Sequence, residues 1–140
     1  MITQLKIENY KSIQELTLDV GRVNVLIGEN GCGKSNILEA ITLAATAEAN
    51  DLKDNSLEIR GVRVTESELM RSSFDKNYQK KPVKIFIQSI DFNCNETYTL
   101  NRDDKSYSQW KRLEEIDTVK TYLDYALEIL KNTSNHKLFV

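Results

Sequence analysis

Alternating hydrophobic and polar positions predict two half-buried strands at the start of the chain. Residues 3–10 place Leu5 and Ile7 on one face, and residues 16–20 alternate again. A period of two is typical of a strand with one buried face. The next segment, 23–27, is almost continuously apolar, which favours a strand covered on both faces inside an α/β sheet.

A helix is expected after the glycine-rich loop that follows this apolar run. Hydrophobic residues recur there at intervals of three and four, which predicts an amphipathic helix over 35–49 that packs on the 23–27 strand. Farther along, Thr65 and Glu68 have the spacing of a capping box, so a short helix is expected over 66–75. The apolar stripe of the first helix consists of Ile37, Leu38, Ile41, Ala44 and Ala45.

The second half of the chain predicts a hairpin and a long helix. Val83, Ile85 and Ile87 alternate, and a returning strand at 97–100 makes 83–100 a β-hairpin. Hydrophobic residues then step by three and four over 109–131, as on an amphipathic helix packed on the domain. The predicted parts are a P-loop core over 1–50, a variable helical insert over 51–82, a hairpin and loop over 83–108, and the long helix over 109–131.

The loop before the first helix carries the chemistry. Its sequence, Gly28-Glu29-Asn30-Gly31-Cys32-Gly33-Lys34-Ser35, is a full match to the G-x-x-x-x-G-K-[ST] motif. Glycines let phosphate oxygens approach the backbone, whose N–H groups form a nest at the start of the helix. Lys34 supplies a cation for the β- and γ-phosphates, Ser35 is the expected Mg²⁺ ligand, and Cys32 is a small residue at a free position. The motif predicts binding of ATP with Mg²⁺.

Composition narrows the class of protein but does not identify a binding partner. The chain has 140 residues, of which 40% are hydrophobic and 29% charged, as in one ordinary soluble domain. A net charge of −2 gives no global attraction to nucleic acid or to an anionic membrane. Two cysteines without CxxC spacing argue against a zinc site or a disulfide framework. We find no signal peptide and no membrane span, so a cytoplasmic protein is expected.

Three stretches in the first 46 residues match the pattern of one family: Asn9-Tyr10-Lys11-Ser12, Asn30-Gly31 and Ile37-Leu38-Glu39-Ala40-Ile41. With them the segment resembles the N-terminus of SMC, RecF and OLD-family ATPases, which are ABC-type heads often catalogued as AAA ATP-binding domains. The resemblance implies a partial P-loop α/β fold with an antiparallel β-hairpin and a C-terminal helix. It also implies that Asn30 to Asn36 wrap the phosphates and that Lys11 and Ser12 lie near the nucleotide, although a solvated turn residue is an equal alternative for Lys11.

The chain departs from this family in ways that bear on catalysis. It has neither a Walker B run ending in Asp-Glu nor an LSGGQ-like signature, which the family supplies later in its chain. The acidic pairs Asp103-Asp104 and Glu114-Glu115 do not end an apolar strand, and Gln88 fits an exposed hairpin position better than a Q-loop. We therefore expect an N-terminal segment, from a truncated or split ATPase, that hydrolyses no ATP alone.

Two functions stay open from the sequence. The first is an ATP-binding segment of an ATPase that works in DNA repair, DNA maintenance or phage defence, with a second ATPase head or the missing C-terminal half as its partner. The second is a non-hydrolysing nucleotide-binding module, or a remnant that acts only with a partner. A GTPase is disfavoured because its D-x-x-G and N-K-x-D motifs are missing. One part of the chain is locally basic, and we interpret it as a solvated face in preference to a DNA contact. It comprises Arg60, Arg63, Arg71, Lys76, Lys80 and Lys81.

Overall fold

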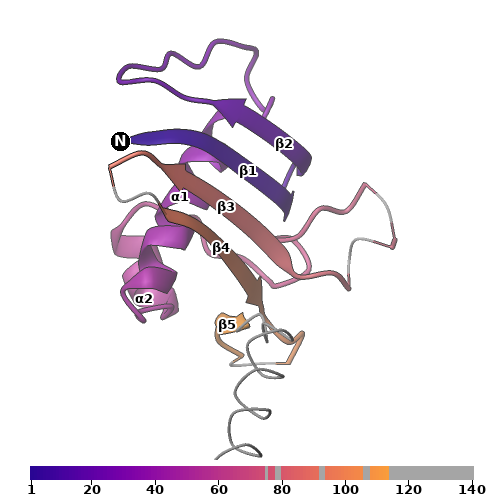
Figure 1. Cartoon of the computed structure of the whole chain (residues 1–140). Helices are drawn as coiled ribbons and strands as arrows, with labels where there is room; N and C mark the ends of the chain where they lie inside the picture. Colours follow the sequence, from indigo (N-terminus) through magenta and orange to yellow (C-terminus); the bar gives the residue numbers. More distant parts are fainter. Residues whose placement is uncertain (75, 78–79, 92–93, 106–107, 114–140) are drawn as a thin grey trace, which may run out of the picture.

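In the part of the chain that the structure describes, five strands form one antiparallel sheet in the order β2-β1-β3-β4-β5, and the helix α1 (Lys34–Glu48) lies against one face of it (Figure 1). The structure is a computed structural model, and it describes residues 1–113 except 75, 78–79, 92–93 and 106–107. The strands are β1 (Ile2–Tyr10), β2 (Ile13–Asp19), β3 (Val83–Ser89), β4 (Cys94–Asn101) and β5 (Lys111–Leu113).

The two predicted N-terminal strands are confirmed as β1 and β2. Leu5 and Ile7 are buried, while Lys6 and Glu8 between them are exposed, as the alternation requires. β1 pairs with β2 on one side and with β3 on the other, so that Ile7 lies opposite both Leu16 and Ile85. A segment from the middle of the chain thus lies beside the N-terminal strand and extends the apolar face.

The predicted hairpin over 83–100 is also present, because β3 and β4 are antiparallel neighbours. Val83 and Ile85 point to the covered face and are fully buried, and Tyr98 lies opposite Ile85. The hairpin therefore continues the same apolar surface onto which the helix packs.

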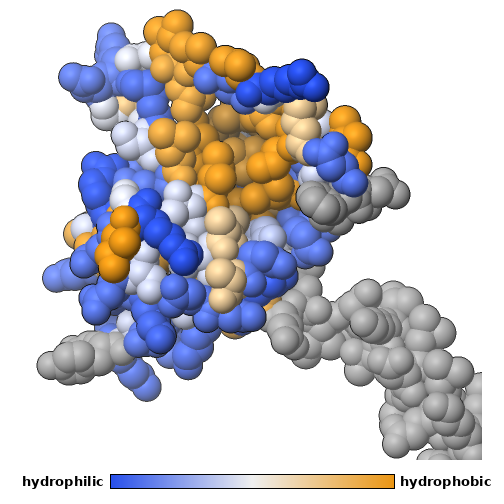
Figure 2. Space-filling view, turned by 90° about the vertical axis from the view of Figure 1, so that its left-hand side faces the viewer, coloured by the Kyte–Doolittle hydropathy of each residue, from blue (hydrophilic) through white to orange (hydrophobic). Residues whose placement is uncertain are grey.

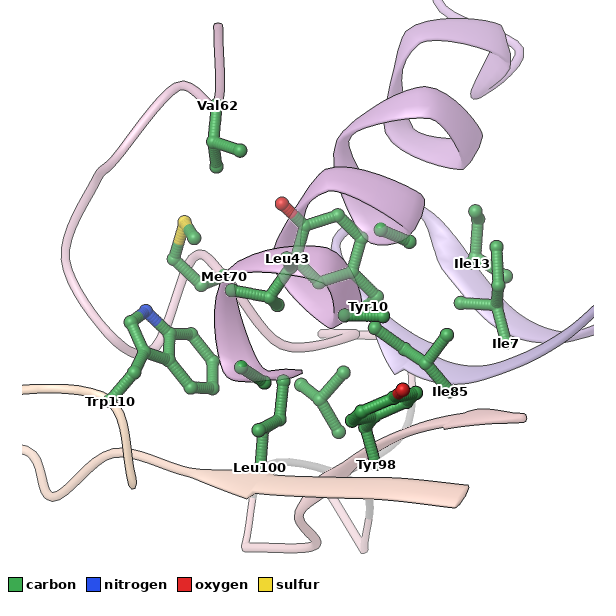
Figure 3. Close-up of a cluster of buried hydrophobic side chains, with 14 of the residues drawn as sticks. Ile7, Tyr10, Ile13, Leu43, Val62, Met70, Ile85, Tyr98, Leu100 and Trp110 are labelled. Carbon is green, nitrogen blue, oxygen red and sulfur yellow. The ribbon is translucent and has the colours of Figure 1, made fainter. Parts of the chain in front are cut away.

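Helix α1 (Lys34–Glu48) covers this surface and confirms the helix expected over 35–49. Its buried hydrophobic residues are Ala40, Leu43, Ala44 and Ala47, and Figure 3 shows Leu43 facing Tyr10 and the sheet. The predicted stripe is rotated from the observed one, since Leu38 is 60% exposed and Ala45 is exposed as well.

A helix over 66–75 is not formed, and the segment makes a single turn instead. The N–H of Met70 donates to Glu66, but the Met70 carbonyl accepts from Lys11 N rather than from a later residue of a helix. Ser72 N likewise donates to the Asn9 side chain at 3.0 Å. Contacts with Asn9 of β1 and with Lys11 of the turn after it therefore take the groups that a longer helix would need. The predicted helical insert over 51–82 contains a short helix at an earlier position, α2 (Asp54–Ile59), whose Leu57 is buried.

The prediction of an interior strand at 23–27 is wrong for this structure. The segment is a loop with no strand paired to it among the described residues, and Val25 and Ile27 are 76% and 90% exposed. A strand buried on both faces needs sheet neighbours, and the described strands belong to the antiparallel sheet. Helix α1 consequently packs on that sheet and not on this run.

The predicted helix over 109–131 does not begin at residue 109. Trp110 is 3% exposed in the core near Met70 (Figure 3), and β5 follows it and pairs with β4. Burial of the indole and this pairing hold the backbone extended. The rest of that predicted helix, with Glu114 and Glu115, lies outside the described residues. In the part that the structure describes, the helices are too short or too polar to cross a membrane.

Candidate phosphate-binding site

The motif loop turns sharply and leads directly into α1. Gly31 and Gly33 have positive φ angles of 84° and 97°, a region that residues with a side chain rarely adopt. Gly33 caps α1, which begins at Lys34. The first N–H groups of a helix have no partner within the helix and carry its positive dipole end, so the loop lies where an anion is favoured.

Lys34 folds back over the loop. Its ammonium donates to the carbonyls of Gly28 at 2.7 Å and Glu29 at 2.6 Å, and it lies 3.5 Å from the Cys32 sulfur. A side chain at Gly28 would bring its Cβ within 2.7 Å of that sulfur. The loop is therefore tightly closed, with its cation held at the loop and Cys32 exposed.

These residues fit a magnesium–nucleotide complex better than a metal ion alone. Ser35 is exposed on the first turn of α1, next to Lys34. Over the described part of the chain, no three His, Cys, Asp or Glu side chains are grouped so that they could hold a metal. Mg²⁺ usually keeps several waters and is held by few protein groups together with substrate phosphates. A hydroxyl, an ammonium and a helix N-terminus suit that arrangement.

The β1–β2 turn, which carries Lys11 and Ser12, packs against this loop. A Cβ at Gly33 would lie 3.0 Å from the Ser12 hydroxyl, and the Asn36 amide donates to the same hydroxyl at 2.7 Å. The structure thus brings the turn beside the loop. Lys11 is not a solvated turn residue, because its side chain is 12% exposed and pairs with Glu39.

Glu39 is a buried carboxylate that the sequence interpretation did not single out as a site residue. It is 5% exposed and accepts hydrogen bonds from Lys11, from Arg63 at 2.7 Å and from the Tyr10 hydroxyl at 3.2 Å. Burial raises the pKa of Glu39, but hydrogen bonds from Lys11 and Arg63 lower it further, so the pKa lies below its ordinary value. Burial and the Glu39 carboxylate raise the pKa of Tyr10, which stays a neutral donor.

The three arginines of the basic segment pair with carboxylates of the fold, whereas its lysines, Lys76, Lys80 and Lys81, are exposed. Arg60 lies 3.6 Å from Asp51 and Arg63 pairs with Glu39. Arg71 is buried and pairs with Asp104, which also accepts from Ser67. Asp104 therefore anchors a loop, and the three arginines do not form the free basic face that a DNA contact would use.

Comparison with known proteins agrees with this geometry. The family model described as "AAA domain" matches residues 4–140. The DNA replication and repair protein RecF of Staphylococcus epidermidis strain RP62A is 40% identical over 60 residues, which are 42% of this chain and 16% of that protein. RecF of Staphylococcus carnosus is 34% identical over 89 residues, 61% of this chain and 23% of the relative. The matched part spans less than a quarter of the length of these relatives.

Proposed function

Because the chain belongs to the AAA domain family, whose model it matches over 4–140, we propose that residues 28–36 bind Mg·ATP as the nucleotide site of a RecF- and SMC-like ATPase. The single observation that carries this proposal is the closed loop at the start of α1, with the Lys34 ammonium at its mouth. A chance match to the motif would not require glycines at positive φ together with a helix that begins at Lys34.

Each group of the site has a part in the proposed binding. The Lys34 ammonium neutralises charge on the terminal phosphates, and backbone N–H groups of the loop and of the first turn of α1 donate to phosphate oxygens. The Ser35 hydroxyl ligates the Mg²⁺ that ATP brings with it. Together these groups supply binding and orientation.

Hydrolysis is proposed to need more than this chain provides. Phosphoryl transfer requires a group that orients the attacking water, in addition to a cation and a metal. Asp104 is committed to Arg71 and Ser67, and it does not serve that purpose. We propose that the chain alone binds ATP without turning it over, and that hydrolysis takes place in a larger assembly. The non-hydrolysing module remains the alternative.

An apolar groove beside β1 supports a role within a larger ATPase. Figure 2 views the side of the molecule where the N-terminus and the loop after β2 lie, and hydrophobic side chains gather there around a hollow. A groove of about 530 Å³ on this side is lined in part by Ile2, Leu5, Val20 and Ile41. Exposed apolar surface of this kind marks an interaction site. We propose that further sheet of the complete ATPase, from its C-terminal half, covers it, and that a second head completes the site.

The relatives suggest the biological setting. Their names describe a DNA replication and repair protein, and we propose that this chain serves an ATPase with a role in DNA repair. The pairing of Arg60, Arg63 and Arg71 with carboxylates argues against a DNA contact through these three arginines.

Two measurements on the purified chain separate the proposals. Titration calorimetry with Mg·ATP is expected to show saturable binding by the wild type. Lys34→Ala should weaken the affinity about ten- to hundredfold, because it removes a charged hydrogen-bond donor. Lys53→Ala, on the exposed Lys53 before α2, is the matched control and leaves binding unchanged. A phosphate-release assay is expected to give only background. Steady release that Lys34→Ala abolishes would instead show a catalytic group in this chain.

A further inference from the structure

Glu39 connects three segments that are far apart in the sequence. It lies on α1, whereas Lys11 belongs to the turn between β1 and β2 and Arg63 follows α2. One carboxylate thus holds two cations, and the cluster has a net positive charge beside the motif loop. A buried carboxylate without such partners would cost several kcal/mol, so the three side chains stabilise one another.

The ion-pair cluster reaches the motif loop through two hydrogen bonds. Arg63 donates from its guanidinium to the Asn36 side-chain oxygen at 3.1 Å, and the Asn36 amide donates to Ser12 at 2.7 Å. Ser12 in turn lies against Gly33, the residue that caps α1. Arg63 therefore fixes Asn36 at one end of this chain of contacts, while Lys11 fixes the backbone of the Ser12 turn at the other.

We propose that Glu39 is a positioning residue for nucleotide binding: by holding Lys11 and Arg63 it keeps Ser12 and Asn36 packed against the phosphate loop. The inference rests on the proposed binding of Mg·ATP at residues 28–36. Glu39 itself touches no phosphate, because it lies within α1 and its carboxylate is already enclosed by Lys11, Arg63 and Tyr10.

The direction in which one substitution changes the affinity for Mg·ATP distinguishes a positioning role from a purely electrostatic one. Glu39→Gln removes a negative charge near the site of an anionic ligand and frees two cations. If charge alone mattered, the variant would bind Mg·ATP as well as the wild type or more tightly. If Glu39 positions the loop, the variant binds more weakly, by about tenfold, as loss of an outer-shell partner typically does.

Two further variants complete the experiment. Glu48→Gln makes the same charge change at the other end of α1, where Glu48 accepts from Tyr98 and Arg112, and it is expected to leave the dissociation constant unchanged. Glu39→Asp keeps the charge but shortens the side chain. We expect its affinity to fall between those of the wild type and of the Gln variant, and it decides the question if the Gln variant does not fold.

Calorimetry with Mg·ATP on the full chain gives the outcome, with circular dichroism to show that each variant is folded. Weaker binding by folded Glu39→Gln and Glu39→Asp, with Glu48→Gln unchanged, supports the inference. Wild-type affinity in both Glu39 variants, or tighter binding in Glu39→Gln, overturns it while the proposed nucleotide binding stands. No saturable binding by the wild type overturns the proposed function and this inference with it.

Discussion

Gly33→Ala tests the geometry of the loop, because the structure predicts two separate effects of this substitution on stability. The first is backbone strain: Gly33 has a φ of +97°, and a left-handed conformation costs a residue with a side chain roughly 1–2 kcal/mol. The second is a contact, since the new Cβ would lie 3.0 Å from the Ser12 hydroxyl, which accepts from Asn36. Displacing that hydrogen bond costs about 1 kcal/mol more. Gly33→Ala is therefore expected to lower the free energy of unfolding by roughly 2–3 kcal/mol.

Gly61→Ala is the matched control for this prediction. Gly61 has a similar φ of +88°, but nothing lies within 4 Å of the position that its Cβ would take. Its substitution should show the strain alone, and it should leave Mg·ATP binding unchanged, whereas Gly33→Ala weakens binding as well. Urea denaturation and calorimetry measure the two quantities. Equal stability losses for both variants, with equal ATP affinity, would refute the proposed contact between Ser12 and the loop.

Further predictions concern the core and the ionised groups. Leu43→Ala should destabilise the fold by about 2–5 kcal/mol, because Leu43 is fully buried. Leu38→Ala, on the exposed side of α1, should change the stability by less than about 0.5 kcal/mol, and thermal melts of the two variants measure the difference. The pKa of Glu39 is lowered in the folded state, so its ionised form contributes stability above the ordinary pKa of 4.5, and this stability is lost as the pH falls through the folded pKa. Glu39→Gln should therefore make the free energy of unfolding fall less steeply with decreasing pH. An unchanged acid limb of the pH–stability curve would contradict the pairing. Burial and the nearby Glu48 raise the pKa of Tyr98 to about 12, and Glu48→Gln should lower the tyrosinate midpoint in an ultraviolet titration.

The elements that could be predicted from the sequence are those with a local pattern. The alternation around Leu5 and Ile7 and again around Ile85 follows from the period of a strand with one buried face, and the helix after the loop follows from its spacing of three and four. The motif loop was recognisable because its residue types and their order are fixed by phosphate chemistry.

The elements that were missed depend on contacts between distant residues. The apolar run at 23–27 reads as a buried strand in any local window, but burial depends on sheet neighbours that the described residues do not supply. The 66–75 segment has a capping box, yet Asn9 of β1 and Lys11 of the following turn take its backbone groups. In each case tertiary contacts decided the outcome over the local signal.

The cluster around Glu39 was invisible for the same reason. Lys11 and Arg63 are 28 and 24 positions away from Glu39 along the chain, so no window of sequence joins them. Helical periodicity assigns polar residues such as Asn36, Glu39 and Thr46 to an exposed face, whereas the structure buries all three on the side of α1 that also carries Leu43.

Hydrogen–deuterium exchange with and without Mg·ATP tests the central claim most directly, because it reports where the nucleotide binds. If the account is right, ATP slows amide exchange in residues 28–36 and in the first turn of α1, and Lys34→Ala abolishes this protection while exchange in β3 and β4 stays unchanged. Protection that appears elsewhere, or that survives Lys34→Ala, would contradict the assignment of the loop as the nucleotide site.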